Sequence, residues 1–385
     1  MILIPLINQD EFEKKHLELM EKVLPFYPSE IYGDPSRNNS NISAAKQGKI
    51  KDARRLLYKY EKLYRFIYLK DDTEPYPPSN KDAETKFVYK DRLRQLLVGR
   101  TEKMTQGNRR NELVNIINSI GELGNSNSNN HNSNSNNNND NSSEELIKRV
   151  FKYSEVSRRD EEKETLKNLG VEVCPYCNRA FTSTIIKRKE IRGVRPQLDH
   201  YFPKTKYPYL AVNFYNLIPS CGICNQNKGH IDTYKYPIMY PFDEGLGTEY
   251  RFVTYPDNSS LGYLYGELDM NASFSLQIEP IVNKIRMSEM DADSRKDFEK
   301  RIKNSIEFFK LRELYSSHLS YAEIILRNGH IYKQYLPILQ KNFPDAKFSL
   351  DDIKTIMYCQ DIRQDQWYKN ILSKMKNDLD YEVMR

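Results

Sequence analysis

Four of the five cysteines form two closely spaced pairs, and this pattern constrains the fold more than any other feature of the sequence. The pairs are Cys174-Pro-Tyr-Cys177 and Cys221-Gly-Ile-Cys224. Two intervening residues let both thiolates of a pair reach one tetrahedral ion at about 2.3 Å. Two such pairs complete a four-sulfur shell that leaves no vacancy for a substrate. The sequence therefore predicts a structural Zn²⁺ site.

Redox chemistry is the alternative interpretation of these cysteines. A thioredoxin-like Cys-x-x-Cys motif needs only one pair in a βαβ setting, so the second pair favours metal binding. Five cysteines in 385 residues are too few for a disulfide scaffold. Cys359 has no partner nearby in the sequence, and we predict that it is an ordinary buried thiol.

Length and composition bound the class of protein. At about 150 residues per domain, a chain of 385 residues is expected to form two to three domains. A hydrophobic content of 38% with 29% charged residues excludes wholesale disorder and excludes a membrane protein. The apolar start, residues 1–7, is interrupted by Pro5 and resembles neither a secretory signal nor a membrane span. The chain is therefore expected to be cytoplasmic.

The excess positive charge is concentrated in one segment. Residues 171–241 carry ten basic and four acidic side chains, so this segment holds the entire net charge of +6. A basic segment within an otherwise neutral chain indicates a polyanionic partner, most often nucleic acid. A solvated basic surface is the alternative, and charge alone does not distinguish the two.

A low-complexity stretch divides the chain. Residues 124–143 are almost entirely Asn and Ser and contain no apolar residue, which predicts a disordered linker. The preceding region is rich in helix formers, and helices are expected at 44–68, 91–97 and 110–123. We therefore predict a helical N-terminal domain over 1–123, the linker over 124–143, a zinc-containing core over 144–282, and a helical C-terminal region over 283–385.

Strand patterns are confined to the predicted core, so the predicted fold class is α+β. A helix that begins at Glu144, capped by Ser142 or Ser143, is expected to end just before Gly170. Short strand-like pieces follow at 171–173 and 181–186, and residues 197–200 are expected to end another strand. A small antiparallel sheet is predicted from 250–255, 262–267 and 274–278, and helices are expected from Pro280 onward.

A second group of residues that can carry chemistry lies between and beside the cysteine pairs. Asp199-His200 stands in the run Gln-Leu-Asp-His-Tyr-Phe-Pro-Lys, Asn216 follows sixteen residues after His200, and Asn225 directly follows the last paired cysteine. This order resembles the HNH nuclease family, whose ββα-metal fold often carries a four-cysteine zinc site placed in this way. A surface Asp–His pair is the alternative for the two residues taken alone. The cysteine frame and the two asparagines in register favour the resemblance.

The resemblance implies a role for each residue. His200 would be the general base that activates water, a task that suits a neutral imidazole near neutral pH. Asp199 and Asn225 would bind Mg²⁺ or Mn²⁺, and Asn216 would hold the loop that orients His200. Many relatives carry His at the position of Asn225, and the weaker amide ligand favours Mg²⁺ or Mn²⁺ over softer ions.

Basic residues near this motif are candidate phosphate contacts. Lys204 and Lys206 directly follow the Asp-His pair, and Lys228 shares a helical face with Asn225. Arg195 belongs to a basic loop that precedes the motif. Such contacts give affinity without sequence information, and a merely solvated lysine is the alternative at each position. Aromatic residues interleaved with the lysines can stack on bases, but at this density they more often pack around a small zinc core.

Two classes of function follow from these patterns. The first is a metal-dependent endonuclease that hydrolyses phosphodiester bonds of nucleic acid, with double-stranded DNA as the expected substrate. The second is a non-catalytic zinc module that binds nucleic acid or a protein partner. RNA cleavage remains a further alternative, because phosphate chemistry and basic contacts serve both nucleic acids.

The wider run of motifs resembles a bacterial branch of HNH proteins. The run comprises Cys-Pro-Tyr-Cys, Leu-Asp-His-Tyr-Phe-Pro-Lys, Asn-Phe-Tyr-Asn-Leu-Ile-Pro-Ser-Cys and Cys-Asn. This branch includes the nuclease subunit of the Septu anti-phage system, which works beside an ATPase. The resemblance therefore implies antiviral defence and an ATPase subunit as a partner, and no membrane partner is expected.

Overall fold

The structure, a computed structural model, describes most of the predicted core and of the C-terminal region. The described residues are 1–23, 96–99, 148, 150–188, 193–256, 274–281, 290–344 and 350–384. The predicted linker at 124–143, the helices at 44–68 and 110–123, the strand at 262–267 and the helix start at Glu144 with its caps all lie outside these ranges. Of the helix expected at 91–97, only residues 96 and 97 are described, and both are helical.

The described elements alternate short helices with two small sheets. The first part of the chain forms α1 (Gln9–Val23), α8 (Tyr153–Val156), α9 (Asp160–Leu169), β1 (Gln197–His200), η1 (Pro208–Leu210), η2 (Phe214–Asn216), β2 (Leu217–Ser220) and α10 (Gly222–Lys228). The second part forms β3 (Tyr250–Pro256), β4 (Phe274–Pro280), α13 (Ala292–Phe308), α14 (Leu311–Ser316), α15 (Leu319–Asn342), α16 (Leu350–Tyr358), η3 (Gln364–Gln366) and α17 (Ser373–Met384). The fold is therefore α+β.

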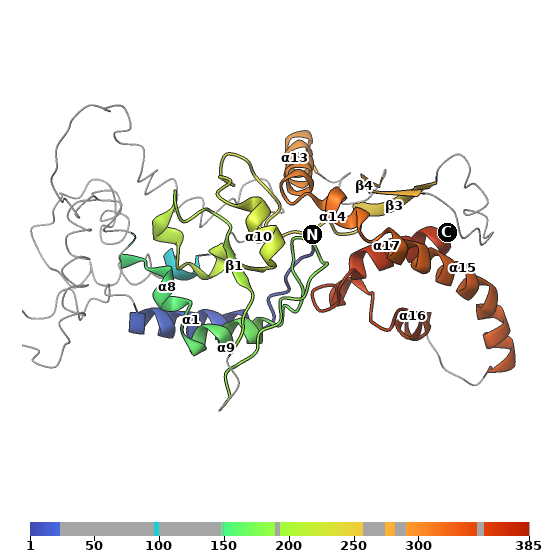
Figure 1. The fold of residues 1–385 in the computed structure, drawn as a ribbon, viewed down its shortest axis with the longest axis horizontal. Coiled ribbons are helices and arrows are strands. Elements are labelled where there is room, and N and C mark those ends of the chain that lie inside the picture. Colours follow the sequence, from blue (N-terminus) through green and yellow to red (C-terminus); the bar gives the residue numbers. More distant parts are fainter. Residues whose placement is uncertain are drawn as a thin grey trace, which may run out of the picture.

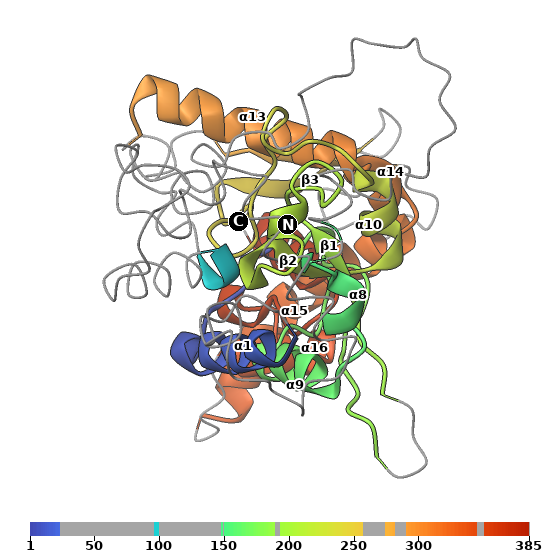
Figure 2. The same ribbon diagram turned by 90° about the vertical axis from the view of Figure 1, so that its left-hand side faces the viewer.

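The elements are spread along the long axis of the molecule. Figure 1 shows α1, α8 and α9 toward one end and α15, α16 and α17 toward the other, with β1 and α10 nearer the first end. Both views place α13 on the side opposite α1 and α9, and Figure 2 shows it running along that side. Within the described ranges, no helix is both long enough and apolar enough to cross a bilayer.

Both sheets consist of two antiparallel strands. β1 pairs with β2 so that Asp199 faces Ile218 and His200 faces Leu217. β3 pairs with β4 over their full lengths, which confirms the sheet predicted from 250–255 and 274–278. The strand expected to end at residues 197–200 is confirmed as β1, which does end at His200 and begins at Gln197.

Two other strand predictions were only partly correct. Within the described residues, the pieces at 171–173 and 181–186 form isolated bridges, Val173 with Phe181 and Ile185 with Val194, rather than extended strands. Phe181 and Ile185 are 63% and 51% exposed, so little apolar burial is available to stabilise a longer ladder here.

The predicted helix that ends before Gly170 is divided in the structure. α8 and α9 are separated at residues 157–159, where Arg159 has an extended backbone, and α9 then begins with three acidic residues in its first turn. Acidic side chains are favourable at a helix N-terminus, which supports a new start at this point. Gly170 ends α9 with a φ of +71°, as the sequence predicted.

The N-terminal segment belongs to the main hydrophobic core. Met1, Phe12 and Leu19 lie in the same buried cluster as Tyr176 and Phe214. The backbone amide of Ile2 donates to the Pro175 carbonyl at 2.8 Å, directly within the first cysteine turn. The described part of the predicted N-terminal domain therefore packs against the cysteine-bearing region.

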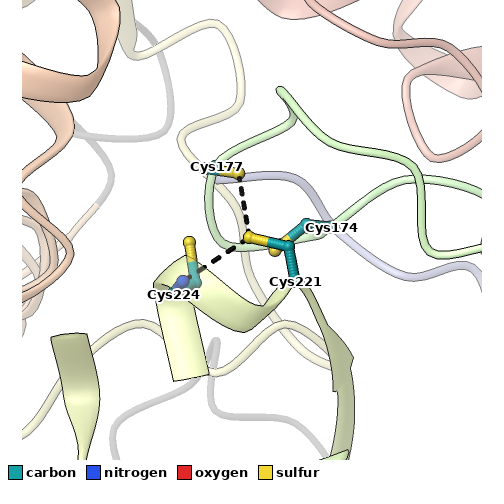
Figure 3. Close-up of side chains that lie close together, drawn as sticks. All are labelled: Cys174, Cys177, Cys221 and Cys224. Atoms are coloured by element: carbon teal, nitrogen blue, oxygen red, sulfur yellow. Dashed lines mark hydrogen bonds between the residues drawn. The ribbon is translucent and has the colours of Figure 1, made fainter. Parts of the chain in front are cut away.

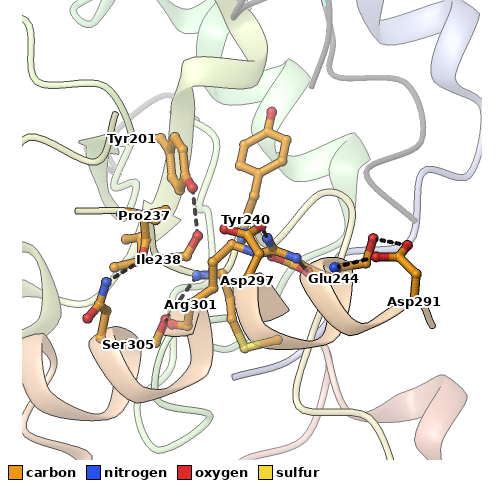
Figure 4. A network of polar contacts seen from close by, with 12 residues as sticks. Tyr201, Pro237, Ile238, Tyr240, Glu244, Asp291, Asp297, Arg301 and Ser305 are labelled. Carbon is orange, nitrogen blue, oxygen red and sulfur yellow. Dashed lines mark hydrogen bonds and ion pairs between the residues drawn. The ribbon is translucent and has the colours of Figure 1, made fainter. Parts of the chain in front are cut away.

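α13 holds the segment 237–244 through buried polar contacts (Figure 4). Arg301 forms ion pairs with Glu244, at 2.8 Å between Nε and Oε1, and with Asp297. Ser305 Oγ accepts from the Met239 amide at 2.9 Å. On the other side of the segment, the Tyr201 hydroxyl donates to the Ile238 carbonyl at 2.7 Å. α13 is thus connected to the residue that directly follows His200.

Candidate metal centre and neighbouring site

The two cysteine pairs converge on one point. Their four sulfur atoms all lie within 4.8 Å of one another, and the Sγ atoms of Cys177 and Cys221 are 3.9 Å apart. A tetrahedral zinc with bonds of about 2.3 Å separates its sulfur ligands by about 3.8 Å. Figure 3 shows the pairs approaching from the turn at 174–177 and from the start of α10. The cluster can therefore hold a zinc ion in a closed sulfur shell.

Local backbone contacts place both cysteine pairs. Cys221 is the N-cap residue of α10, and its Sγ accepts from the Cys224 amide at 3.5 Å. In the first pair, the Asn178 amide donates to the Cys174 carbonyl at 2.7 Å, and Asn178 has a φ of +52°. The Tyr315 hydroxyl donates to the Cys177 carbonyl at 2.6 Å, so α14 also supports this turn.

The fifth cysteine corrects one prediction. Cys359 is exposed, not buried, and it follows the end of α16 with a φ of +51°.

The β1–β2 hairpin presents different residues on its two faces, because alternate residues of a strand point in opposite directions. Gln197 and Asp199 contact α10: Gln197 Oε1 accepts from Asn225 Nδ2 at 2.8 Å, and Asp199 pairs with Lys228. His200 lies on the other face, against Tyr153 of α8. The structure therefore brings Asp199 and Asn225 to one face and places His200 on the opposite one.

Asp199 is fixed by two buried donors. Its Oδ1 accepts from Lys228 Nζ at 2.9 Å, and its Oδ2 accepts from the Tyr176 hydroxyl at 2.7 Å. Lys228 Nζ also donates to the His200 carbonyl at 2.6 Å. Asp199 is 2% exposed and Lys228 1% exposed. Burial raises the pKa of Tyr176 well above its usual range, with the nearby Asp199 carboxylate as the next cause, so Tyr176 remains a donor.

This arrangement corrects the predicted role of Lys228. The helical geometry suggested a phosphate contact, but the Lys228 side chain has 0% exposure and its ammonium is directed at Asp199 and the His200 carbonyl. An ammonium enclosed in this way is not accessible to a phosphate in solution. Lys228 instead connects α10 to the end of β1.

His200 is a buried, neutral imidazole. Its Nε2 lies 3.0 Å from the Ala211 carbonyl oxygen, which can only accept, so Nε2 carries the proton and Nδ1 carries the lone pair. Burial lowers the pKa of His200 to about 3, and the positive charge of Lys204 adds to this effect. The ring meets that of Tyr153 edge-on, with centroids 4.7 Å apart, and His200 is 9% exposed.

Asn216 holds the loop that follows His200. Its Oδ1 accepts from the Phe202 amide at 2.7 Å, and its Nδ2 donates to the carbonyls of Phe202 at 3.1 Å and Leu210 at 3.0 Å. Asn216 has 0% exposure. Three hydrogen bonds made by this buried side chain fix both ends of the loop 202–210, which leads directly to Ala211, the residue whose carbonyl contacts the His200 ring.

Asn225 stands in the first turns of α10 and is partly exposed. Its Nδ2 donates to Gln197, which leaves the carbonyl oxygen Oδ1 as the side-chain atom able to bind a cation. Gly229 ends α10, and Cys221 caps its start.

The remaining predicted phosphate contacts differ in exposure. Lys204 is exposed, and its Nζ lies 5.5 Å from the centre of the Tyr153 ring. Lys206 is 48% exposed at its side chain and pairs with Asp232 at 2.9 Å. Arg195 donates to the carbonyls of Ser157 and Pro196 and lies 3.4 Å from Glu162, so it is largely committed to internal contacts.

Sequence reasoning missed two residues beside the site. Tyr176 binds Asp199, and its position between the cysteines of the first pair could have indicated proximity to the metal centre. Tyr153 covers His200, and no feature of its local sequence distinguishes it. Tyr153 was missed because its contact joins residues 47 positions apart through tertiary packing.

Together these features define an α+β protein in which a four-cysteine centre able to bind zinc lies beside a β-hairpin and a short helix. Part of the chain is similar to a known protein. Over 45 residues, 12% of this chain, it is 49% identical to the Septu protein PtuB of Bacillus thuringiensis, and the match spans 18% of that relative's length. No protein-family profile and no solved structure matches the chain.

Proposed function

We propose that this protein is a metal-dependent endonuclease that hydrolyses phosphodiester bonds of nucleic acid, with DNA as the substrate. One observation carries the proposal. The succession β1, β2, α10 carries Asp199 and His200 at the end of β1 and Asn225 on the adjoining helix α10, beside the four-cysteine centre, with His200 on the opposite face of β1 from Asp199. This is the order of elements expected for the ββα-metal core of an HNH nuclease.

Asp199 and His200 point to opposite faces of β1, so they do not converge on one phosphate in the described arrangement. In phosphoryl transfer the attacking and leaving oxygens lie in line at a single phosphorus atom, so the base and the metal ligands must converge on it. The proposal therefore requires the end of β1 to change conformation when metal and substrate bind.

The tautomer of His200 is the one that a general base needs. Nε2 is committed to the Ala211 carbonyl, so Nδ1 is the atom that can take a proton from water. Burial lowers the pKa of the ring to about 3, so the imidazole is neutral at pH 7 but is a weak proton acceptor, and the proposed role requires this pKa to rise when metal and substrate bind. Asn216 fixes the loop that includes residues 202–210 and thereby maintains the direction of the ring.

Asp199 and Asn225 offer a carboxylate and an amide oxygen, which are the donors that Mg²⁺ or Mn²⁺ prefers. Such an ion, when bound, stabilises negative charge on the phosphate oxygens. Lys228 now pairs with Asp199 Oδ1, so binding at this oxygen requires displacement of the ammonium. We propose that this exchange accompanies loading of the metal.

The partial similarity to a Septu protein supports a role in anti-phage defence and an ATPase subunit as partner. Both belong to the proposal, because the match covers a small part of each chain.

Plasmid cleavage tests the proposal. The zinc-loaded full chain is incubated with supercoiled DNA and Mg²⁺ or Mn²⁺, and nicked and linear products are quantified. We expect metal-dependent cleavage that His200→Ala reduces at least 100-fold per folded molecule with its zinc content kept, and thermal unfolding measures the stability lost through the unpaired Ala211 carbonyl. Nicking by His200→Ala at the wild-type rate would refute the assignment. His318→Ala, outside the site, is the matched control.

A non-catalytic zinc module is the second candidate, and the burial of the site favours it. Asp199 and Lys228 are at most 2% exposed, and Tyr153 covers His200. This candidate predicts salt-dependent nucleic-acid or protein binding with no cleavage under any metal or with an ATPase partner added.

A further inference from the structure

The tyrosines that follow His200 divide into two groups. Tyr201, Tyr207, Tyr209 and Tyr215 are 0–3% exposed and form part of the core. Tyr234 and Tyr236 are 42% and 58% exposed, and the exposed Lys235 lies between them. The density of aromatic residues in this segment is thus explained by core packing for the first group only. Residues 234–236 are called the Tyr-Lys-Tyr turn below.

The Tyr-Lys-Tyr turn is held on a rigid base. Asp232 is 4% exposed, and its carboxylate accepts from Lys206 at 2.9 Å, from the Tyr207 hydroxyl at 3.0 Å and from the Tyr234 amide at 3.2 Å. The amide of Tyr236 donates to the Asp232 carbonyl at 2.8 Å. A fixed backbone lowers the entropic cost of binding through the exposed rings.

The turn also lies close to the proposed reaction centre. Thr233 Oγ1 donates to the carbonyl of Tyr201, the residue that follows His200, at 2.5 Å. Lys206 and Tyr207, bound to Asp232, belong to the loop that Asn216 fixes beside His200. A nucleic acid strand bound at the end of β1 would therefore lie close to the Tyr-Lys-Tyr turn.

The charged side chains of the segment that carries the turn are mostly basic. Residues 201–236 contain a single carboxylate, that of Asp232, and it is buried and paired with Lys206. Lys204 and Lys235 are exposed in the same segment. Basic side chains beside exposed aromatic rings complement a phosphate backbone with accessible bases.

We infer that the Tyr-Lys-Tyr turn binds nucleic acid through unpaired bases, which stack on Tyr234 and Tyr236 while Lys235 contacts the backbone. Exposed aromatic rings interleaved with basic residues are the arrangement by which proteins bind single strands, because every base offers a π-face. In a duplex the bases are stacked on one another and offer no face to the rings. The inference deepens the proposed function by replacing the expected duplex with single-stranded or locally unpaired nucleic acid.

Binding is measured separately from cleavage. The zinc-loaded His200→Ala chain is titrated, without added divalent metal, against a labelled 20-nucleotide oligothymidylate, the matching oligouridylate, and a DNA duplex of the same length. The first two arms distinguish DNA from RNA, and the third distinguishes unpaired from paired bases.

Stacking is worth roughly 1–3 kcal/mol per base, so the loss of two stacking rings in the double variant Tyr234→Ala/Tyr236→Ala is expected to weaken binding of the single strands at least about 30-fold. Its affinity for the duplex should change less than about 2-fold. Tyr234→Phe/Tyr236→Phe should bind single strands as the parent does, because the ring faces are kept. Lys235→Ala should reduce the slope of log K against log salt by about 1.

Tyr321→Ala, an equally exposed tyrosine at 53% on α15, is the matched control and should bind normally. Unchanged single-strand affinity in the double Ala variant overturns the inference, and so does equal weakening toward duplex and single strand. Absence of single-strand binding by the parent also overturns it. If tyrosine-dependent binding is found but no condition gives cleavage, the proposed nuclease fails while the binding turn stands.

Discussion

Two buried histidines, one in α1 and one at the end of β1, have nearly the same local contacts. His16 Nε2 lies 2.9 Å from the carbonyl oxygen of Val212. His200 Nε2 lies 3.0 Å from the carbonyl oxygen of Ala211, the residue that precedes Val212 in the chain. Burial lowers the pKa of His16 to about 4 and that of His200 to about 3. A neutral, hydrogen-bonded histidine is therefore not by itself evidence of a reactive site.

The surroundings of the two rings differ. His16 is 2% exposed and packs on Phe214, and no charged group contributes to its pKa shift. His200 is close to the charges of Lys204 and Lys228 and follows a carboxylate that faces the opposite side of the strand. The comparison teaches that charge and access around the ring, more than its burial or pKa, distinguish a candidate base from a structural histidine.

Loss of the metal is expected to have the largest effect on stability. It should act on α10 and, through Lys228 of that helix, on the backbone at His200. Cys224→Ser removes one ligand of the centre that fixes α10, the helix that carries Lys228 and Asn225. Zinc bound to four cysteines contributes roughly 10 kcal/mol or more to folding in small domains, so we expect loss of zinc and a marked fall in the unfolding temperature. Metal analysis and thermal unfolding measure both.

The exposed Cys359 provides the control for this experiment. Cys359→Ser lies outside the cluster and should keep one zinc per chain and wild-type stability. Full zinc content in Cys224→Ser would contradict the four-sulfur centre.

Substitution of the two histidines tests the comparison directly. A general base contributes about 100- to 10,000-fold, so His200→Ala should reduce the cleavage rate by that factor. His16→Ala should lose stability through the unpaired Val212 carbonyl and the vacated core space, but its rate per folded molecule should stay within about 2-fold of wild type. Single-turnover cleavage corrected for the folded fraction measures both effects, and equal losses of rate would remove the distinction.

Lys228 gives the next effect. Lys228→Met leaves the Asp199 carboxylate buried with only Tyr176 as a partner, and breaking a buried ion pair costs about 3–5 kcal/mol. Urea unfolding of the zinc-loaded protein measures this loss. Lys167→Met, exposed on α9, should change the free energy of unfolding by less than about 0.5 kcal/mol.

Lys228 also carries a consequence for metal loading. If its ammonium competes with a divalent ion for Asp199, folded Lys228→Met should reach half-maximal cleavage at a lower Mg²⁺ concentration than wild type. A higher Mg²⁺ requirement would show that Lys228 supports the metal site and does not compete with it.

The sequence was most informative for features that depend on short distances along the chain, such as the cysteine pairs of the metal centre and the residues that end helices. Paired cysteines predicted a cluster that the structure brings within 4.8 Å, and Gly170 marked a helix end correctly. The strand expected to end at 197–200 is β1, which ends at His200. The helix ends and the strand depend on contacts between residues close in the sequence, and the metal centre depends on the preference of zinc for cysteine sulfur.

Features that depend on tertiary packing were not predictable in this way. Helical periodicity correctly placed Lys228 on the same face of α10 as Asn225. Periodicity does not show which residues pack against that face. In the structure the Lys228 ammonium donates to the Asp199 carboxylate there. Tyr153 reaches His200 across the fold, and Cys359 is exposed just after the end of α16. Roles that rest on these contacts require the three-dimensional structure.

The smallest effect is the pH dependence of stability that His16 contributes. Its pKa is near 6.5 when exposed and about 4 in the fold, so between these values the unfolded chain binds a proton that the folded chain does not. Stability from this group is therefore complete above pH 6.5 and is lost as the pH falls toward 4, at roughly 1.4 kcal/mol per pH unit and about 3 kcal/mol in total. His16→Gln, whose amide can still donate to Val212, should flatten the dependence by that slope.

Urea unfolding at several pH values from 4.5 to 7 measures the difference between the two proteins. Protonation of the cysteine ligands weakens zinc binding in acid in both, and His200 titrates in both, so only the difference between the curves reports on His16. Parallel curves would show that His16 is not held neutral by burial. In that case His16 and His200 would differ in protonation, and a lowered histidine pKa would belong only to His200 at the end of β1.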